Sequence, residues 1–289
     1  MKIRNIPRNL AVYSRRLVYR NAINLPYISG DFFSSLSDYS FSERDIFEVE
    51  KKRELVSKAD VIFIPGHLYE DICIAFTSAL NPKIIVLGNS DRDFFTPLNG
   101  VPSSVKRIFL QNSTISNEKY QTIPIGLENQ RLGANGLKHL FGEKFIRSKK
   151  NNSVLFGPFS PTHADRRFIN TLENSVNGEW VVLRERISAR KYASLASNFL
   201  YVACPRGNGL DTHRFWETLY RGSYPVVISS DWSRKMKNLG YPVVEIDDWS
   251  AENIHSVLKV ERPPINPEKI EALWASFWKS KILSELSSA

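Results

Sequence analysis

The chain has 289 residues, of which 42% are hydrophobic and 24% are charged. These proportions are ordinary for a globular protein of about two domains, and they exclude wholesale disorder and fibrous architectures. Thirty-nine Lys and Arg residues against 30 Asp and Glu residues leave a net charge of +9, which favours phosphates, nucleotides, nucleic acid or an anionic membrane surface as partners without choosing among them.

The N-terminal segment is strongly basic. Between Met1 and Tyr27 there is no acidic residue, and aliphatic and aromatic side chains separate the basic ones. The basic residues are Lys2, Arg4, Arg8, Arg15, Arg16 and Arg20. Such a segment can rest on an anionic leaflet, or it can be an ordinary first element with solvated arginines. No recognisable nucleic-acid-binding module accompanies the charge, so nucleic acid is not an expected partner.

The sequence also bears on the compartment. No run approaches the roughly 18 consecutive apolar residues of a spanning helix, and the N-terminus lacks the long apolar core and cleavage site of a secretory signal. Cys73 and Cys204 are the only cysteines, and by themselves they form neither a disulfide framework nor a four-ligand zinc site. We expect a cytoplasmic protein with reduced thiols, with peripheral contact to the inner face of the cytoplasmic membrane as an open alternative.

From residue 46 onwards, apolar periodicity predicts alternating helices and strands. Helical spacing marks residues 46–59, and a second helix at 69–80 ends at Asn81-Pro82. Short apolar runs predict buried strands at 61–65, 83–88, 107–112 and 121–127. This alternation predicts α/β layers around a largely parallel sheet.

A polar, basic stretch at 146–153 is predicted to be a linker, after which the alternation resumes. Strands are predicted at 154–159, 180–185, 199–204, 224–229 and 242–246. Helices are predicted at 163–176, 188–198, 212–222, 250–260 and, after three prolines, about 268–286. We therefore expect domains at residues 1–148 and 149–266, followed by a C-terminal helix within 267–289.

The most informative segment is 199–227, whose pattern predicts a strand, a glycine-bearing loop, a helix and a second strand. Gly207 and Gly209 allow the backbone to approach a ligand closely. Asp211 or Thr212 is a good N-cap, so the following helix presents free N–H groups to an anion such as a diphosphate.

Charged side chains surround this loop. Arg206 lies in it, and Arg214 lies in the first turn of the helix. Glu217 follows His213 and Arg214 by four and three residues, so the three can share one helix face. A carboxylate there suits vicinal hydroxyls such as those of a ribose. A purely structural interpretation competes, in which His213 is a hydrogen-bonded core residue and Arg214–Glu217 an intrahelical ion pair. Packing does not require so many polar residues between a buried strand and a buried helix, which favours a ligand site.

Residues 204–227, CPRGNGLDTHRFWETLYRGSYPVV, resemble the signature of exostosin-like glycosyltransferases, most closely the bacterial members acting on capsule or lipopolysaccharide glycans. A weaker match is RIFLQNSTISNEKYQTIPIGLEN at 107–129, and HADRR at 163–167 adds a third. Together they extend the resemblance over roughly residues 60–230.

The resemblance implies a GT-B fold: two Rossmann-like domains facing a cleft, with the acceptor on the N-terminal side, the nucleotide-sugar donor in the C-terminal domain and a last helix crossing back to the first. It implies that Arg214 and the helix N-terminus hold the diphosphate, that Glu217 binds the ribose hydroxyls, and that Arg166 or Arg167 supplies a second cation. The other donor-binding candidates are Arg206, Gly207, Asn208, Gly209, Asp211 and His213. Fixed positive groups stabilise a departing diphosphate without a metal, so no cofactor or metal ion is expected.

Inverting sugar transfer needs a general base for the acceptor hydroxyl, and the ends of strands are the places to look. His67, Asp91 and Glu128 each follow a predicted strand of the N-terminal half. Asp91 is our first choice because it follows a strand and a Gly-Asn-Ser turn. It could equally cap a helix or pair with a neighbouring arginine.

Alternatives remain open at this point. Asp91 and Asp93 have the spacing of the metal-binding Asp-x-Asp of GT-A transferases, although that leaves residues 199–227 unexplained. Inversion is expected on family grounds, and the second glutamate of a retaining pair is absent because Pro225 stands eight residues after Glu217. The sequence predicts a glycosyltransferase that moves a sugar from a nucleotide-diphosphate sugar to a growing capsule or lipopolysaccharide O-antigen glycan. A non-catalytic nucleotide- or glycan-binding protein is the alternative from another class.

Overall fold

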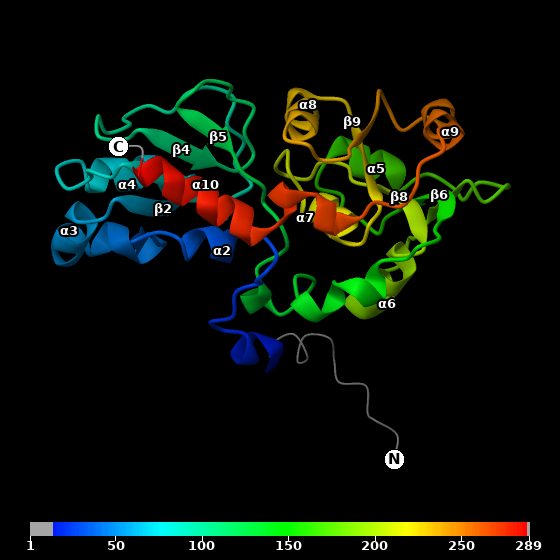
Figure 1. Cartoon of the computed structure of the whole chain (residues 1–289), viewed down its shortest axis with the longest axis horizontal. Helices are drawn as coiled ribbons and strands as arrows, with labels where there is room; N and C mark the ends of the chain where they lie inside the picture. The colour runs from blue at the N-terminus through cyan, green and yellow to red at the C-terminus, as the bar shows by residue number, and fades with distance from the viewer. Residues whose placement is uncertain (1–13, 288–289) are drawn as a thin grey trace, which may run out of the picture.

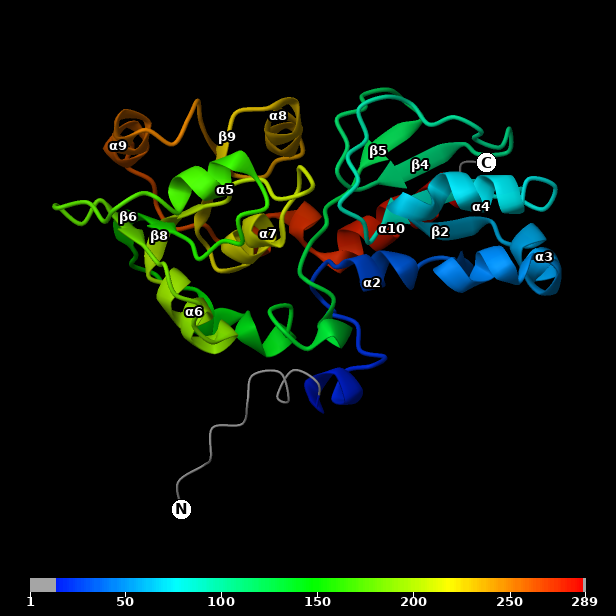
Figure 2. The same cartoon turned by 180° about the vertical axis from the view of Figure 1, so that it is seen from behind.

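A computed structural model describes residues 14–287 of the chain (Figure 1). Within these residues there are two five-stranded sheets, both parallel throughout, and each forms the centre of one lobe. Figures 1 and 2 show the lobes side by side, with α10 on the N-terminal lobe and the first described residues beneath both.

The sheet of the N-terminal lobe runs β1-β2-β3-β4-β5 in chain order. Its apolar strands pair in register, for example Ile62 with Ile85 and Ile85 with Ile108, and these three side chains are fully buried. The strands are β1 (Tyr39–Ser40), β2 (Val61–Pro65), β3 (Ile84–Gly88), β4 (Arg107–Leu110) and β5 (Tyr120–Thr122). The helices of this lobe are α2 (Gly30–Ser34), α3 (Val49–Ser57) and α4 (Tyr69–Ala75).

The sheet of the C-terminal lobe has the order β10-β9-β8-β6-β7. Its strands are β6 (Asn151–Phe156), β7 (Trp180–Val182), β8 (Phe199–Ala203), β9 (Tyr224–Ile228) and β10 (Val244–Ile246). Its helices are α5 (Ala164–Ile169), α6 (Ala189–Ala196), α7 (His213–Tyr220), α8 (Asp231–Asn238) and α9 (Ala251–Lys259). Because β7 and β8 lie on opposite sides of β6, the direction of strand progression reverses at β6.

The last helix, α10 (Ala275–Ser287), packs on the N-terminal lobe. The Trp278 ring lies 6.2 Å from that of Phe33, and Glu285 forms an ion pair of 2.9 Å with Arg107 at the start of β4. The apolar core itself extends across the lobes, since Phe33 and Trp278 belong to the same buried cluster as Trp216 of α7. Two Rossmann-like parallel sheets and a C-terminal helix returning to the first lobe confirm the predicted GT-B type of α/β fold.

The structure corrects several predicted elements. The strand predicted at 121–127 ends at Thr122, and the helix predicted at 163–176 ends at Ile169. Strand β6 begins at Asn151, inside the predicted linker. Two short 3-10 turns, Pro267–Lys269 and Glu271–Leu273, replace the start of the last helix. The sequence did not predict α2, β1 or α8.

Candidate functional site

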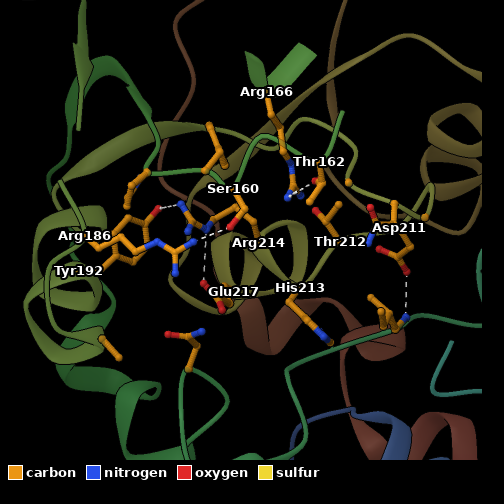
Figure 3. Close-up of a pocket in the computed structure, with 18 of the residues that line it drawn as sticks. Ser160, Thr162, Arg166, Arg186, Tyr192, Asp211, Thr212, His213, Arg214 and Glu217 are labelled. Atoms are coloured by element: carbon orange, nitrogen blue, oxygen red, sulfur yellow. Dashed lines mark hydrogen bonds and ion pairs between the residues drawn. The ribbon is translucent and has the colours of Figure 1, made fainter. Parts of the chain in front are cut away.

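A cavity of about 370 Å³ lies at the carboxyl ends of β6 and β8. This is where the strand order of the C-terminal sheet reverses, and in open α/β sheets ligands bind in the crevice outside such a point. Its walls come from the segment after β6, from the loop 207–212 and α7, and from Arg186 and Ile187 after β7. Asp91 and Ile125 of the N-terminal lobe close the other side. We call it the switch-point cavity (Figure 3).

Arg214, in the first turn of α7, is held by groups of three different elements. Its Nη1 donates to the carbonyl oxygen of Gly157 at 3.1 Å and to the hydroxyl of Tyr192. The guanidinium lies 4.1 Å from the centroid of the Tyr192 ring, and Nε is 3.6 Å from a carboxylate oxygen of Glu217. Gly157 has φ +73°, and a Cβ there would lie 2.5 Å from the carbonyl oxygen of Leu183, so this turn after β6 requires glycine.

Arg166, on α5, is less well compensated. Its Nη groups donate to Thr162 Oγ1 at 3.1 Å and to the carbonyl oxygen of Pro205 at 3.4 Å. Its Nε is buried and has no hydrogen-bond partner among the described residues, and no carboxylate of residues 14–287 lies within ion-pair distance. Burial lowers the pKa of its guanidinium, and the positive charge of Arg214 lowers that pKa further. A cation that burial and a like charge both disfavour is stabilised by a bound anion.

The two guanidiniums flank one aromatic ring. Arg166 and Arg214 lie 5.7 Å and 5.5 Å from the centroid of Phe159. Gly207 leaves room for Arg166, because a Cβ at this glycine would lie 2.8 Å from its Nη2. Arg167, the other predicted second cation, is exposed and does not line the cavity.

Glu217 lies one turn further along α7 and is almost fully buried. Its Oε2 is 3.6 Å from Arg214 Nε and 3.4 Å from Nη1 of Arg221, whose side chain is only 3% exposed. Burial lowers the pKa of Arg221, whose guanidinium also lies over the ring of Phe141. Glu217 is therefore the counter-ion of two buried arginines, and it also lines the switch-point cavity.

The loop 206–210 is tied to the N-terminal lobe. Asp93 accepts from Arg206 at 2.7 Å and from the backbone N–H of Leu210 at 2.8 Å. Asn208 donates to Asp91 at 3.0 Å. Arg206 does not line the cavity, whereas residues 207–209 do. Asp91 and Asp93 thus both bind the loop 206–210, each through different partners. These contacts and the fold of two parallel sheets do not fit the GT-A alternative.

Asp211 is buried, and both its oxygens are used within the protein. One accepts from the backbone N–H of Ile125 at 2.8 Å and the other from Trp216 Nε1 at 2.7 Å. Burial raises the pKa of its carboxyl to about 7, although these donors lower it. The predicted donor-binding residue Asp211 therefore lines the cavity and also joins the lobes through the hydrogen bond from Ile125.

A second cavity, of about 590 Å³, lies on the N-terminal lobe. Among the described residues, Asp91, Ile125 and His213 line both cavities, so the two adjoin there. His67 lines this first-lobe cavity, and its side chain is half exposed. Glu128 lines neither, because its carboxylate accepts from the backbone N–H groups of Asn135 and Gly136 at 2.6 Å and 3.3 Å and so holds that turn. Of the predicted bases, Asp91 lies at the junction, His67 lines the first-lobe cavity alone and Glu128 lines neither cavity.

Some cavity residues were not predicted from the sequence. They include Phe159, Ser160, Thr162, Arg186, Tyr192 and Arg221. Only Arg221 had a local signal, since it follows Glu217 by four residues on the same helix. Among the described residues, no group of three or more His, Cys, Asp or Glu side chains is placed to share a metal ion. No helix within residues 14–287 is both long and apolar enough to cross a membrane.

No protein-family model matches the chain, and no curated protein matches it significantly. The exostosin-like resemblance therefore stays a prediction. Among solved structures the chain is similar to AviGT4, a glycosyltransferase involved in avilamycin A biosynthesis, with a TM-score of 0.41 and 10% sequence identity. The similarity covers 78% of this chain and 83% of that one.

Proposed function

We propose that the chain is a glycosyltransferase that transfers a sugar from a nucleoside-diphosphate sugar, without a metal ion and with inversion. The observation that supports this most is Arg166. It is a partly buried cation beside Arg214 in the switch-point cavity, with no acidic partner at ion-pair distance among the described residues and a buried Nε without a hydrogen-bond partner. A diphosphate would supply the anion that this guanidinium lacks.

The same groups suit the chemistry of sugar transfer. When the bond from the anomeric carbon to the diphosphate breaks, negative charge grows on the phosphate oxygens. Arg166 and Arg214 are already fixed by Thr162, Pro205, Gly157 and Tyr192, so little reorganisation is needed to stabilise that charge. Glu217, at the wall of the same cavity, is placed to accept hydrogen bonds from ribose hydroxyls.

We place the acceptor in the first-lobe cavity, which adjoins the switch-point cavity at Asp91, Ile125 and His213. A sugar bound at this junction would have its anomeric carbon exposed to a hydroxyl group from the other side. The growing glycan of capsule or lipopolysaccharide O-antigen is proposed as acceptor on the resemblance of residues 204–227 alone.

The proposal is tested by nucleotide binding and by turnover. UDP, GDP, ADP and CMP are added separately, and the melting temperature is measured; a binding nucleotide raises it because it binds only the native state. Cleavage of UDP-glucose, UDP-N-acetylglucosamine, UDP-galactose and GDP-mannose is then followed by release of the nucleoside diphosphate, with and without EDTA. Binding without release from any donor would favour a non-catalytic binding protein, and activity lost in EDTA would contradict the metal-independent mechanism.

We also propose that the N-terminal segment contacts anionic membranes. Lys2, Arg4 and Arg8 lie outside the described residues. Of the remainder, Leu17 and Val18 are 63% and 76% exposed and lie between the exposed residues Arg16 and Arg20. Exposed apolar side chains flanked by arginines suit insertion into a headgroup region.

A further inference from the structure

His213 occupies the junction of the two cavities. It is the first residue of α7, and its half-buried side chain lines both the switch-point cavity and the first-lobe cavity. Figure 3 shows its ring turned away from Arg214, towards the N-terminal lobe. The imidazole therefore lies between the proposed donor and the proposed acceptor.

One hydrogen bond fixes the protonation pattern of this ring. His213 Nδ1 lies 2.8 Å from the carbonyl oxygen of Gly126. A carbonyl oxygen can only accept, so Nδ1 carries the hydrogen, and the lone pair of the neutral imidazole is on Nε2. A histidine with Nδ1–H bound to a fixed acceptor and a lone pair directed elsewhere is the arrangement of a general base.

The acceptor of that hydrogen bond is held rigidly. Gly126 has φ +68°, and a Cβ there would lie 2.2 Å from the carbonyl oxygen of Ile28, so only glycine fits. On one side of it the Leu127 N–H donates to the Ile28 carbonyl oxygen at 2.8 Å. On the other side the Ile125 N–H donates to Asp211, two residues before His213. The carbonyl and the imidazole are thus fixed to each other through both lobes.

We propose that His213 is the general base of the transfer, an inference that rests on the proposed function. The acceptor hydroxyl gives its proton to Nε2 of His213 while its oxygen forms a bond to the anomeric carbon. The bond from that carbon to the diphosphate breaks, and the leaving oxygen keeps the electron pair beside Arg214 and Arg166. Asp91 lines the same junction, but it is exposed and accepts a hydrogen bond from Asn208.

The test uses His213→Asn and His213→Ala in the full chain. The asparagine amide can still donate to the Gly126 carbonyl but offers no basic nitrogen at the position of Nε2.

Cleavage of the four nucleotide sugars named above is measured with water as acceptor. We expect kcat to fall by about 100-fold or more in both variants, with the KM of the donor and the thermal shift produced by the nucleoside diphosphate unchanged. Added imidazole should restore part of the activity of His213→Ala, which a purely structural role does not predict. His139→Asn is the matched control and keeps wild-type rates, because His139 is exposed and lines neither cavity.

Three results would overturn the inference, and they differ in what else they overturn. Wild-type kcat in His213→Asn, together with a loss in Asp91→Asn, would make Asp91 the base and leave the proposed function intact. A rise in KM with kcat unchanged would make His213 a binding residue. If the wild-type protein neither binds the nucleotides nor cleaves a donor, the proposed function is wrong and the role of His213 falls with it.

Discussion

The carboxylate of Asp211 accepts a hydrogen bond of 2.8 Å from the backbone N–H of Ile125, 86 residues earlier in the chain. The same side chain accepts from Trp216 of α7, and its own backbone N–H donates to Asn112 at the end of β4. One residue thus joins the start of α7 to two segments of the N-terminal lobe. Together with the contacts of Asp91 and Asp93 to the loop 206–210, it fixes the relative position of the proposed donor and acceptor sites.

This carboxyl makes the stability of the protein depend on pH. Its pKa is raised to about 7 in the folded protein, above its ordinary value in the unfolded chain. The contribution of the protonated carboxyl to the free energy of unfolding is therefore fully present below the unfolded pKa of about 4. It decreases as the pH rises towards 7 and is lost above that value. We expect the melting temperature of the wild type to fall relative to that of Asp211→Asn as the pH rises from 4 to 7. At higher pH the difference should be constant.

The control is Asp231→Asn, because this carboxylate is exposed and its ion-pair partner among residues 14–287 is Arg234 of the same helix. Its melting temperature should follow that of the wild type at every pH. A constant difference between wild type and Asp211→Asn from pH 4 to 8 would contradict the raised pKa.

Arg166 and its neighbour Arg167 provide a second test. Replacing Arg166 by Gln removes a charge-assisted contact to the diphosphate, which contributes about 1.5–3 kcal/mol. We expect the affinity for the binding nucleoside diphosphate, measured by calorimetry, to fall by about tenfold or more. The fold should not lose stability, because this partly buried cation has no acidic partner at ion-pair distance in residues 14–287.

Arg167→Gln is the matched control, since Arg167 is exposed on the same helix and outside the cavity. Its affinity should be that of the wild type. The reverse result, with Arg167→Gln weakened and Arg166→Gln unaffected, would contradict the placement of the diphosphate.

Glu217 should affect both stability and binding. In Glu217→Gln, Arg214 and Arg221 lose their shared counter-ion in a buried environment. Removing one partner of a buried ion pair costs about 3–5 kcal/mol, and we expect a decrease near the lower limit in urea unfolding because Arg214 keeps Tyr192 and Gly157. The increase in melting temperature caused by a nucleoside diphosphate should shrink as well, because a neutral amide with one accepting oxygen binds ribose hydroxyls more weakly than a carboxylate does.

Glu252→Gln, on the exposed side of α9, is the comparison and should be neutral. An unchanged free energy of unfolding in Glu217→Gln would mean that Arg214 and Arg221 do not depend on this carboxylate.

The sequence predicted the strands well where short apolar runs are bounded by polar residues. Residues 61–65 form β2 as expected, and the predicted strand 83–88 forms β3 from Ile84 onwards, because such runs are buried on both faces of a parallel sheet. The strand predicted at 121–127 was too long at its C-terminal end. Beyond Thr122 the backbone leaves the sheet, and Ile125 and Leu127 are buried against the other lobe and Ile28 instead. Apolar character alone does not separate these two kinds of burial.

The candidate site was predicted only in part, because some of its residues are neighbours in the sequence and others are brought together by the fold. The loop and helix at 206–217 are local in sequence, and spacing was enough to identify Arg214 and Glu217. The wall formed by Phe159 and Tyr192 depends on β6 lying beside β8, which is a property of strand order. Asp211 was interpreted as a helix cap, because its partner Ile125 is 86 residues away.

The proposed membrane contact gives the last prediction. Leu17→Glu combined with Val18→Glu places two acids among exposed arginines and removes the apolar side chains available to the headgroup region. We expect co-sedimentation with vesicles of phosphatidylcholine and phosphatidylserine to fall by about tenfold or more, since each basic residue near the surface contributes about 1 kcal/mol and added acids oppose it.

Binding of the wild type should also decrease as salt rises from 50 to about 500 mM, because screening shortens the range of the attraction. Val176→Glu is the matched control: Val176 is fully exposed on the C-terminal lobe, far from the N-terminal arginines in sequence, and its variant should sediment like the wild type. Equal sedimentation of the double variant and the wild type would show that residues 17 and 18 do not contact the membrane.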